Sequence, residues 1–100
     1  MTGFHLTQAA KADLKAIGRE TQKTWGIGQR NIYLRKLDDS FHLIADNPDM
    51  GTACHDIKQG YRYHHVGRHV IFYRRTTHDI EIVRIFHDRM DYMPYLLAGQ

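Results

Sequence analysis

The feature that most constrains the fold of this chain is a change in the spacing of its apolar residues near Gly60. Before Gly60, apolar or small residues recur every three or four positions, as on one face of an α-helix. After Gly60, they alternate with polar residues, as in β-strands. Helices and strands segregated in this way predict an α+β fold, with a helical hairpin packed on a mostly antiparallel sheet.

Two helices are predicted in the first half of the chain. The first follows Thr7, whose hydroxyl can accept hydrogen bonds from backbone N–H groups of the first turn, and it extends to Trp25. Gly26 interrupts the helical spacing, and the second helix is predicted from about Gln29 to Ala45. Pro48 ends it, because the residue before a proline is pushed out of helical geometry. Because the connection between the two helices is so short, they are predicted to lie side by side in antiparallel orientation.

Four strands complete the predicted order β-α-α-β-β-β. They span Phe4–Leu6, Tyr61–Val66, His69–Arg75 and Ile80–Phe86. A short C-terminal helix is expected at Met90–Leu97, although Pro94 falls inside it. The side chains expected in the core are Leu14, Ile17, Leu37, Phe41, Ile44, Val70, Phe72, Ile82 and Val83.

The second and third strands are predicted to form a hairpin. Gly67-Arg68 is a two-residue loop that starts with glycine, which suits a type II′ turn. The resulting register pairs Val66 with His69, His64 with Ile71, and Arg62 with Tyr73. The more apolar face should meet the helices, and it carries Tyr61, Tyr63, His65, Val70, Phe72 and Arg74. The open face would then carry Arg62, His64, His69 and Tyr73.

The composition fits one small domain that spans residues 1–100. The chain has 100 residues, of which 42% are hydrophobic, so a compact core is expected. The single cysteine, Cys54, cannot form an intramolecular disulfide, which fits a reducing compartment. No apolar run has the length of a signal peptide core or a membrane span. We therefore expect a cytoplasmic protein with no membrane contact.

Charge is distributed unevenly along the chain. The formal net charge is +3, yet no acidic residue occurs from Ile57 to His78. A basic stretch of this kind attracts anions, nucleic acid or an acidic protein segment, or it is simply a solvated hairpin. Its cations are Lys58, Arg62, Arg68, Arg74 and Arg75.

Four segments resemble the ParE-type toxins of the RelE/ParE superfamily. They are Asp13-Leu14 with the later Trp25-Gly26, Asp46-Asn47-Pro48 followed by Met50-Gly51, Val66–Arg74, and Ile82–Asp91. The resemblance covers the chain from Phe4 to about Leu97. It implies a toxin of a type II toxin–antitoxin module, whose partner is a ParD-like antitoxin: a ribbon-helix-helix DNA-binding dimer with a segment that wraps the toxin. It also implies that the free toxin inhibits DNA gyrase in its cleaved-DNA state and is not an enzyme.

Two other functions stay open at this point. The RelE branch shares the fold but cuts mRNA in the ribosome, and a fold does not decide between such functions. That reaction needs a base, an acid and cations around the phosphate. The candidate catalytic residues would be His87, Arg62, Arg68 and Arg89. The closing segment and the lone Lys58 before the hairpin favour the ParE branch. A plain single-strand-binding module ranks third.

The resemblance and the residue types together suggest binding residues. Contacts with the antitoxin are expected from Trp25, Tyr33, Arg62, Arg68 and Arg74. Contacts with the target are expected from Arg89, Met93, Tyr95 and Leu96. We expect no cofactor and no sequence-specific nucleic-acid binding. We also expect no metal, because strand alternation puts His64 and His65 on opposite faces.

Overall fold

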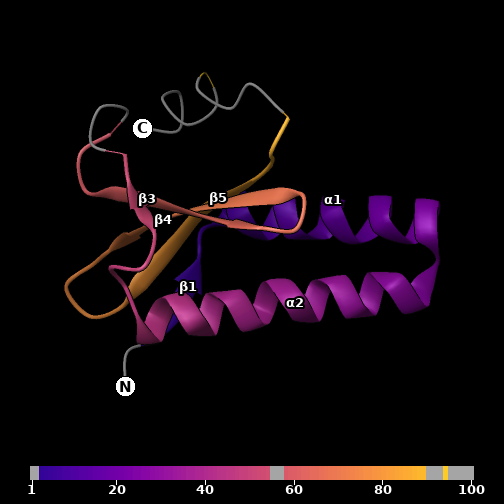
Figure 1. The fold of residues 1–100 in the computed structure, drawn as a ribbon, viewed down its shortest axis with the longest axis horizontal. Coiled ribbons are helices and arrows are strands. Elements are labelled where there is room, and N and C mark those ends of the chain that lie inside the picture. The colour runs from indigo at the N-terminus through magenta and orange to yellow at the C-terminus, as the bar shows by residue number, and fades with distance from the viewer. Residues whose placement is uncertain (1–2, 55–57, 90–93, 95–100) are drawn as a thin grey trace.

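The computed structural model describes residues 3–54, 58–89 and 94, and within them two helices lie against one face of a five-stranded sheet (Figure 1). The elements are β1 (Phe4–Leu6), α1 (Gln8–Trp25), α2 (Ile27–Asp46), β2 (Thr52–Ala53), β3 (Tyr61–Val66), β4 (His69–Arg75) and β5 (Ile80–His87). The predicted α+β fold and element order are therefore confirmed. The short strand β2 is an addition that the sequence did not predict.

The strands lie in the order β1-β5-β4-β3-β2. β1 runs parallel to β5, and the other neighbouring strands are antiparallel. β5, the last strand of the described residues, is thus inserted between β1 and the hairpin of β3 and β4. α1 and α2 run side by side and extend past the sheet at the end where they are joined (Figure 1). No helix among the described residues is long and apolar enough to cross a membrane.

Local hydrogen bonds fix both ends of α1. The Thr7 hydroxyl oxygen accepts from the Ala10 N–H at 3.0 Å and donates to the Val83 carbonyl at 2.7 Å. This capping residue therefore also ties the helix to β5. At the other end, Gly26 has a φ of 90° and donates its N–H to the Gln22 carbonyl at 2.8 Å. Because one glycine suffices for the reversal, α2 begins two residues earlier than predicted.

The hairpin register predicted from the Gly67-Arg68 turn is confirmed. The prediction of its faces was wrong: Ile71 and Tyr73 meet the helices, whereas Val70 and Phe72 point to the other side of the sheet. All four of these consecutive residues are buried, so β4 is apolar on both faces and alternation gives no contrast between them. The helix predicted at Met90–Leu97 lies outside the described residues, apart from Pro94.

The buried apolar residues form two clusters, one on each face of the sheet. The main core lies between the helices and the sheet and contains Ala10, Ile17, Leu37, Phe41, Ile44, Ala45, Val66, Ile71, Tyr73, Ile80, Ile82 and Ile85. The outer cluster, on the opposite face, contains Cys54, Tyr61, Val70, Phe72 and Phe86. Of the side chains predicted to be buried, Leu14 and Val83 are only partly so and the others are buried.

An irregularity in β5 lets α1 close the edge of the sheet. The pairing shifts so that Tyr73 lies opposite Ile82, and both Ile82 and Ile85 can then point into the main core. Past the end of β1, the Asp13 carboxylate of α1 accepts the Ile85 N–H at 3.0 Å. The same carboxylate accepts two bonds from the Arg84 guanidinium, at 2.7 and 2.9 Å. A helix side chain thus continues the hydrogen bonding that β1 begins.

Candidate functional site

A cleft of about 740 Å³ lies between the helical hairpin and the turn of the β3–β4 hairpin. Residues from four parts of the chain meet there: α1, α2, the turn with the start of β4, and the end of β5. The lining residues are Ala16, Ile17, Glu20, Thr21, Thr24, Trp25, Gln29, Tyr33, Gly67, Arg68, His69 and His87.

Tyr33 of α2 joins the helices to the hairpin turn. Its hydroxyl oxygen accepts the Arg68 backbone N–H at 3.1 Å and lies 2.6 Å from Nδ1 of His69. With the Arg68 N–H already donated to that oxygen, we assign the phenolic proton to the bond with Nδ1 of a neutral His69. Burial raises the pKa of Tyr33, so the phenol stays protonated at neutral pH.

Gly67 is required at this turn for two reasons. Its φ is +57°, in the left-handed region that other L-residues rarely adopt. In addition, a Cβ at this position would lie 2.8 Å from the Tyr33 hydroxyl oxygen and ring, which is closer than real Cβ contacts allow. The turn can therefore pack directly on the tyrosine ring only because residue 67 has no side chain.

Two imidazoles, His69 of β4 and His87 of β5, line the cleft on the side of the sheet. The rings of His69 and His87 meet edge to face, with centroids 5.4 Å apart. Burial, and then the neighbouring His87, lower the pKa of His69 to about 4, so its ring is neutral at pH 7. His87 lies at the exposed end of β5, where its Nδ1 accepts the Arg89 backbone N–H at 3.1 Å. Hydrogen bonds inside the protein therefore occupy one nitrogen of each ring.

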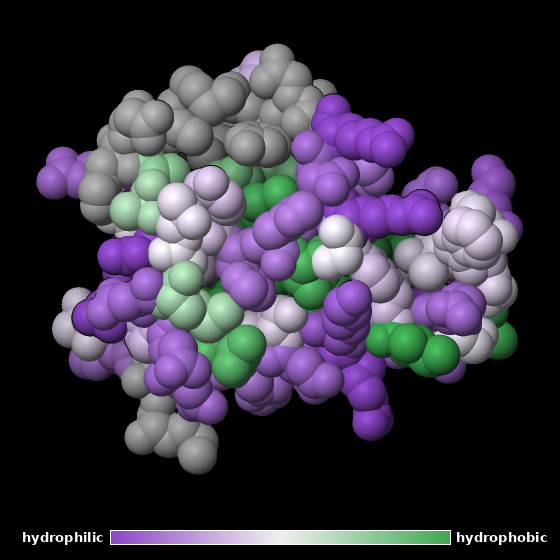
Figure 2. All heavy atoms as spheres, viewed as in Figure 1, coloured by the Kyte–Doolittle hydropathy of each residue, from purple (hydrophilic) through white to green (hydrophobic). Residues whose placement is uncertain are grey.

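Trp25 and Arg68 form the rim of the cleft. Trp25 ends α1 and is 59% exposed, an unusually open position for a tryptophan. The Arg68 guanidinium lies 5.8 Å from the centre of its ring, within cation–π range. Other large apolar side chains, Ile27 and Ile32, are also exposed on the helical hairpin. Apolar groups accordingly reach the surface there, between polar ones (Figure 2). The combination of an exposed indole and a guanidinium is typical of protein–protein contacts.

The cleft contains three of the five residues predicted to bind an antitoxin, namely Trp25, Tyr33 and Arg68. The other two lie elsewhere. Arg62 donates to the Gly51 carbonyl at 2.7 Å, near the far end of β3, and Arg74 donates to Glu81 at 2.8 Å. His69 was not predicted here, because the reversed assignment of the sheet faces put it on an open surface.

The residues proposed for mRNA cleavage are not brought together as a set. His87 and Arg68 share the cleft, and Arg89 follows His87 closely in the chain. Arg62 is held by the backbone oxygens of Gly51 and Asp49, away from the turn. Of the predicted target contacts, Arg89 is exposed, whereas residues 93, 95 and 96 (Met93, Tyr95 and Leu96) lie outside the described residues. In the described part of the chain, no three His, Cys, Asp or Glu side chains are placed to hold a metal ion.

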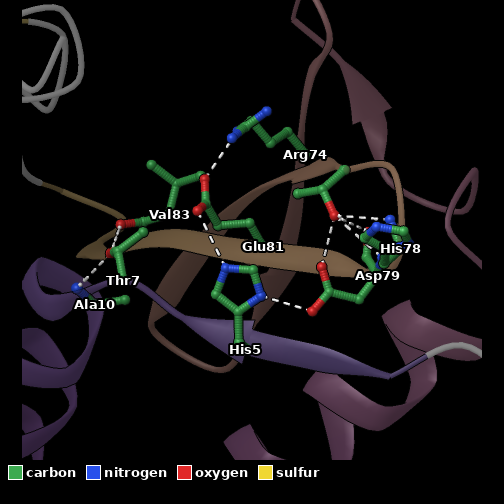
Figure 3. Close-up of polar contacts among 9 residues, drawn as sticks. His5, Thr7, Ala10, Arg74, His78, Asp79, Glu81 and Val83 are labelled. Carbon is green, nitrogen blue, oxygen red and sulfur yellow. Dashed lines mark hydrogen bonds and ion pairs between the residues drawn. The ribbon is translucent and has the colours of Figure 1, made fainter.

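A separate polar cluster joins β1 to β5 (Figure 3). The His5 ring lies between two carboxylates, with Nδ1 2.7 Å from Asp79 and Nε2 3.2 Å from Glu81. The hydrogen bond with Asp79, and then that with Glu81, raise the pKa of His5. Burial alone would raise the pKa of Glu81, but bonds from Arg74 and His5 lower it. These opposite charges compensate one another, so the cluster has a structural role in holding the first strand.

Residues 4–92 match the protein family described as "ParE toxin of type II toxin-antitoxin system, parDE". The chain belongs to the ParE toxin family. It is therefore a toxin of a type II toxin–antitoxin module, as the four resembling segments implied.

Curated relatives agree with this ParE assignment. "Toxin ParE1" of Mycobacterium tuberculosis is 42% identical over 89 residues, covering 88% of this chain and 91% of the relative. "Toxin ParE1" of Caulobacter vibrioides is 35% identical over 96 residues, covering 96% of this chain and 99% of the relative. A solved structure of the "Chromosomal ParDE TA system from P. aeruginosa" superposes with a TM-score of 0.74 at 19% identity, covering 87% of this chain and 96% of that one. The last comparison shows a shared fold.

Proposed function

We propose that this ParE toxin inhibits DNA gyrase by binding alone and that a ParD-like antitoxin neutralises it. Membership of the ParE family supports the target, and the superposed structure from P. aeruginosa is that of a ParDE system. The observation that most supports binding rather than catalysis is the pair Tyr33–His69. His69 is neutral and its Nδ1 is held by a phenol, so the most buried imidazole of the cleft is poorly placed to exchange a proton with a substrate.

The cleft is the surface that we propose the antitoxin covers. Its rim offers an exposed indole and a guanidinium, and less exposed residues that line it include Ile17, Thr21 and Tyr33. An apolar anchor beside an acidic side chain in the partner would bury the Trp25 ring and pair with Arg68. Gly67 and Tyr33 fix the turn before any partner arrives, which reduces the entropy lost on binding.

Ribosome-dependent mRNA cleavage is the second candidate, because His87 and Arg68 line the same cleft. His87 is 45% exposed at its side chain, so a substrate could reach Nε2. The distant position of Arg62, held by two backbone oxygens, weighs against a complete catalytic set. The two candidates differ in what they require of His87: proton transfer in one and packing in the other.

The test is a gyrase supercoiling and DNA-cleavage assay with the purified toxin, run beside a ribosome-dependent mRNA cleavage assay. We expect loss of supercoiling, accumulation of cleaved DNA, and reversal of both effects when a ParD-like antitoxin is added. His87→Ala should keep gyrase inhibition nearly unchanged, as should the control His42→Ala, which alters an exposed histidine on α2.

The opposite pattern would move the chain to the second candidate. In that case mRNA would be cut, gyrase would be unaffected, and His87→Ala would lower the cleavage rate by about 10²–10⁴-fold, the usual contribution of a general acid or base. His42→Ala would leave that rate unchanged.

A further inference from the structure

A line of basic side chains runs along the outer surface of α1. Lys11, Lys15, Arg19 and Lys23 follow one another at intervals of four residues, and all four are exposed. We call them the basic stripe. The first three also line a groove of about 670 Å³ between α1 and α2, together with Arg30 of α2. The other residues of this groove are uncharged: Gln8, Ala12, Leu14, Gly18, Gln22 and Leu34.

Within the described residues, no carboxylate lies within ion-pair distance of the basic stripe. The two acidic residues of α1 point elsewhere: Asp13 binds Arg84, and Glu20 lines the cleft described above. Like charges four residues apart destabilise a helix by about 0.2–0.5 kcal/mol per pair. Among the described residues, intramolecular pairing therefore does not offset this electrostatic cost along α1, and a polyanion bound there would remove it.

We propose that the basic stripe and its groove bind the sugar-phosphate backbone of duplex DNA without reading the sequence. From Lys11 to Arg19 the stripe extends about 12 Å, at about 1.5 Å per residue. That length spans roughly three to four phosphates of one strand, which are spaced about 3.4 Å apart along the duplex axis. Arg30, on the opposite wall of the groove, donates hydrogen bonds to the side chains of Gln22 and Asn31 and adds a further positive charge beside the same strand. The uncharged Gln8 and Gln22 are further donors of the kind that bind phosphate oxygens.

The chemistry of the groove favours duplex DNA over the other polyanions. Single strands are held largely by stacking on aromatic rings, and the residues that line this groove include none. Protein partners use aromatic anchors in an apolar centre, which the cleft with Trp25 and Tyr33 offers and this groove does not. The two surfaces thus differ in their expected partners, protein at the cleft and DNA backbone at the groove.

Salt dependence of binding tests the proposal with the full-length toxin and a fluorescein-labelled DNA duplex of mixed sequence. Neither gyrase nor antitoxin is present, so the result is independent of the proposed function. Four phosphate contacts predict that log K falls against log salt with a slope of about −3.6, at about −0.9 per contact. Lys15→Gln/Arg19→Gln should make the slope shallower by about 1.8. The matched control Arg35→Gln/Lys36→Gln removes the same charge from exposed positions of α2 and should leave the slope unchanged.

Thermal melts establish that each variant is folded. If Lys15→Gln/Arg19→Gln is unfolded, Lys11→Gln/Lys23→Gln tests the same stripe. Equal changes of slope in the stripe and control variants would overturn the proposal, because binding would then follow net charge alone. Equal affinity of the toxin for the matching single strand would overturn the proposal as well. So would full displacement of the DNA duplex by polyglutamate of equal charge.

Discussion

At the scale of single residues, Gly67 and Tyr33 connect the sheet to the helices. The glycine adopts a positive φ, and its missing side chain leaves space for the tyrosine ring. The tyrosine hydroxyl in turn binds the Arg68 N–H and the His69 ring. The position of the cleft wall therefore depends on two residues that lie 34 positions apart (67 minus 33) in the chain.

Gly67→Ala should destabilise the protein more than Gly60→Ala. Both glycines have positive φ, so each substitution incurs about 1–2 kcal/mol of backbone strain. Only at Gly67 would the new Cβ also collide with Tyr33, since nothing lies within 4 Å of a Cβ at Gly60. Overpacking of this kind adds about 1–3 kcal/mol. Urea denaturation of the two variants measures the difference, and equal losses would show that the Tyr33 ring moves aside at little cost.

At the scale of secondary-structure elements, the prediction from sequence was accurate where local signals act. Thr7 caps α1, Gly26 ends it, and the Gly67-Arg68 turn sets the register of the hairpin, because each of these acts within a few residues. β2 was missed because two residues are too few to show alternation.

The arrangement of elements in space was harder to predict. The faces of the hairpin were reversed because β4 is buried on both sides, so no local contrast marks the side that meets the helices. The same error removed His69 from the candidate site. Trp25, Tyr33 and Arg68 do share the cleft, although nothing in their spacing indicates that α1, α2 and the turn converge there. The edge contact of Asp13 with β5 is likewise a long-range feature, 72 positions apart in sequence.

Asp13→Ala should cost about 2–4 kcal/mol, because it removes charge-assisted bonds to Arg84 and leaves the Ile85 N–H without its acceptor. Asp13→Asn should cost less, since an amide oxygen can still accept that N–H. The control Asp38→Ala removes an exposed carboxylate of α2 and should change stability by less than about 0.5 kcal/mol. Chemical denaturation gives all three values. A loss in Asp13→Ala no larger than in the control would mean that solvent satisfies the β5 edge equally well.

At the scale of the whole molecule, pH should alter stability through the cluster that joins β1 to β5 (Figure 3). The folded protein raises the pKa of His5, so protonation of His5 is linked to folding. This contribution is fully present below the unfolded pKa of about 6.5 and is lost as pH rises through the folded value. Asp79 and Glu81 have lowered pKa values, so their contribution is lost only in more acidic solution.

The comparison of wild type with His5→Gln isolates this effect. Urea midpoints measured from pH 5 to pH 9 should differ most at the acidic end and converge as pH rises above the raised pKa of His5. His64 and His69, whose pKa values are lowered, contribute equally to both proteins and cancel in the difference. A difference that stayed constant across this range would contradict the assigned role of His5.

The parallel pairing of β1 with β5 also determines when the toxin can complete its β-sheet during synthesis. His5 meets Asp79 across 74 positions, and the strand that carries its partners is inserted in the middle of the sheet. Translation at about 5–20 residues per second takes roughly 4–15 s to make the intervening segment. Until β5 leaves the ribosome, β1 has no partner strand and β4 is paired only with β3. A nascent toxin therefore cannot complete its sheet until β5 has been translated, so folded toxin appears only after a delay that the separation of β1 and β5 in the sequence sets.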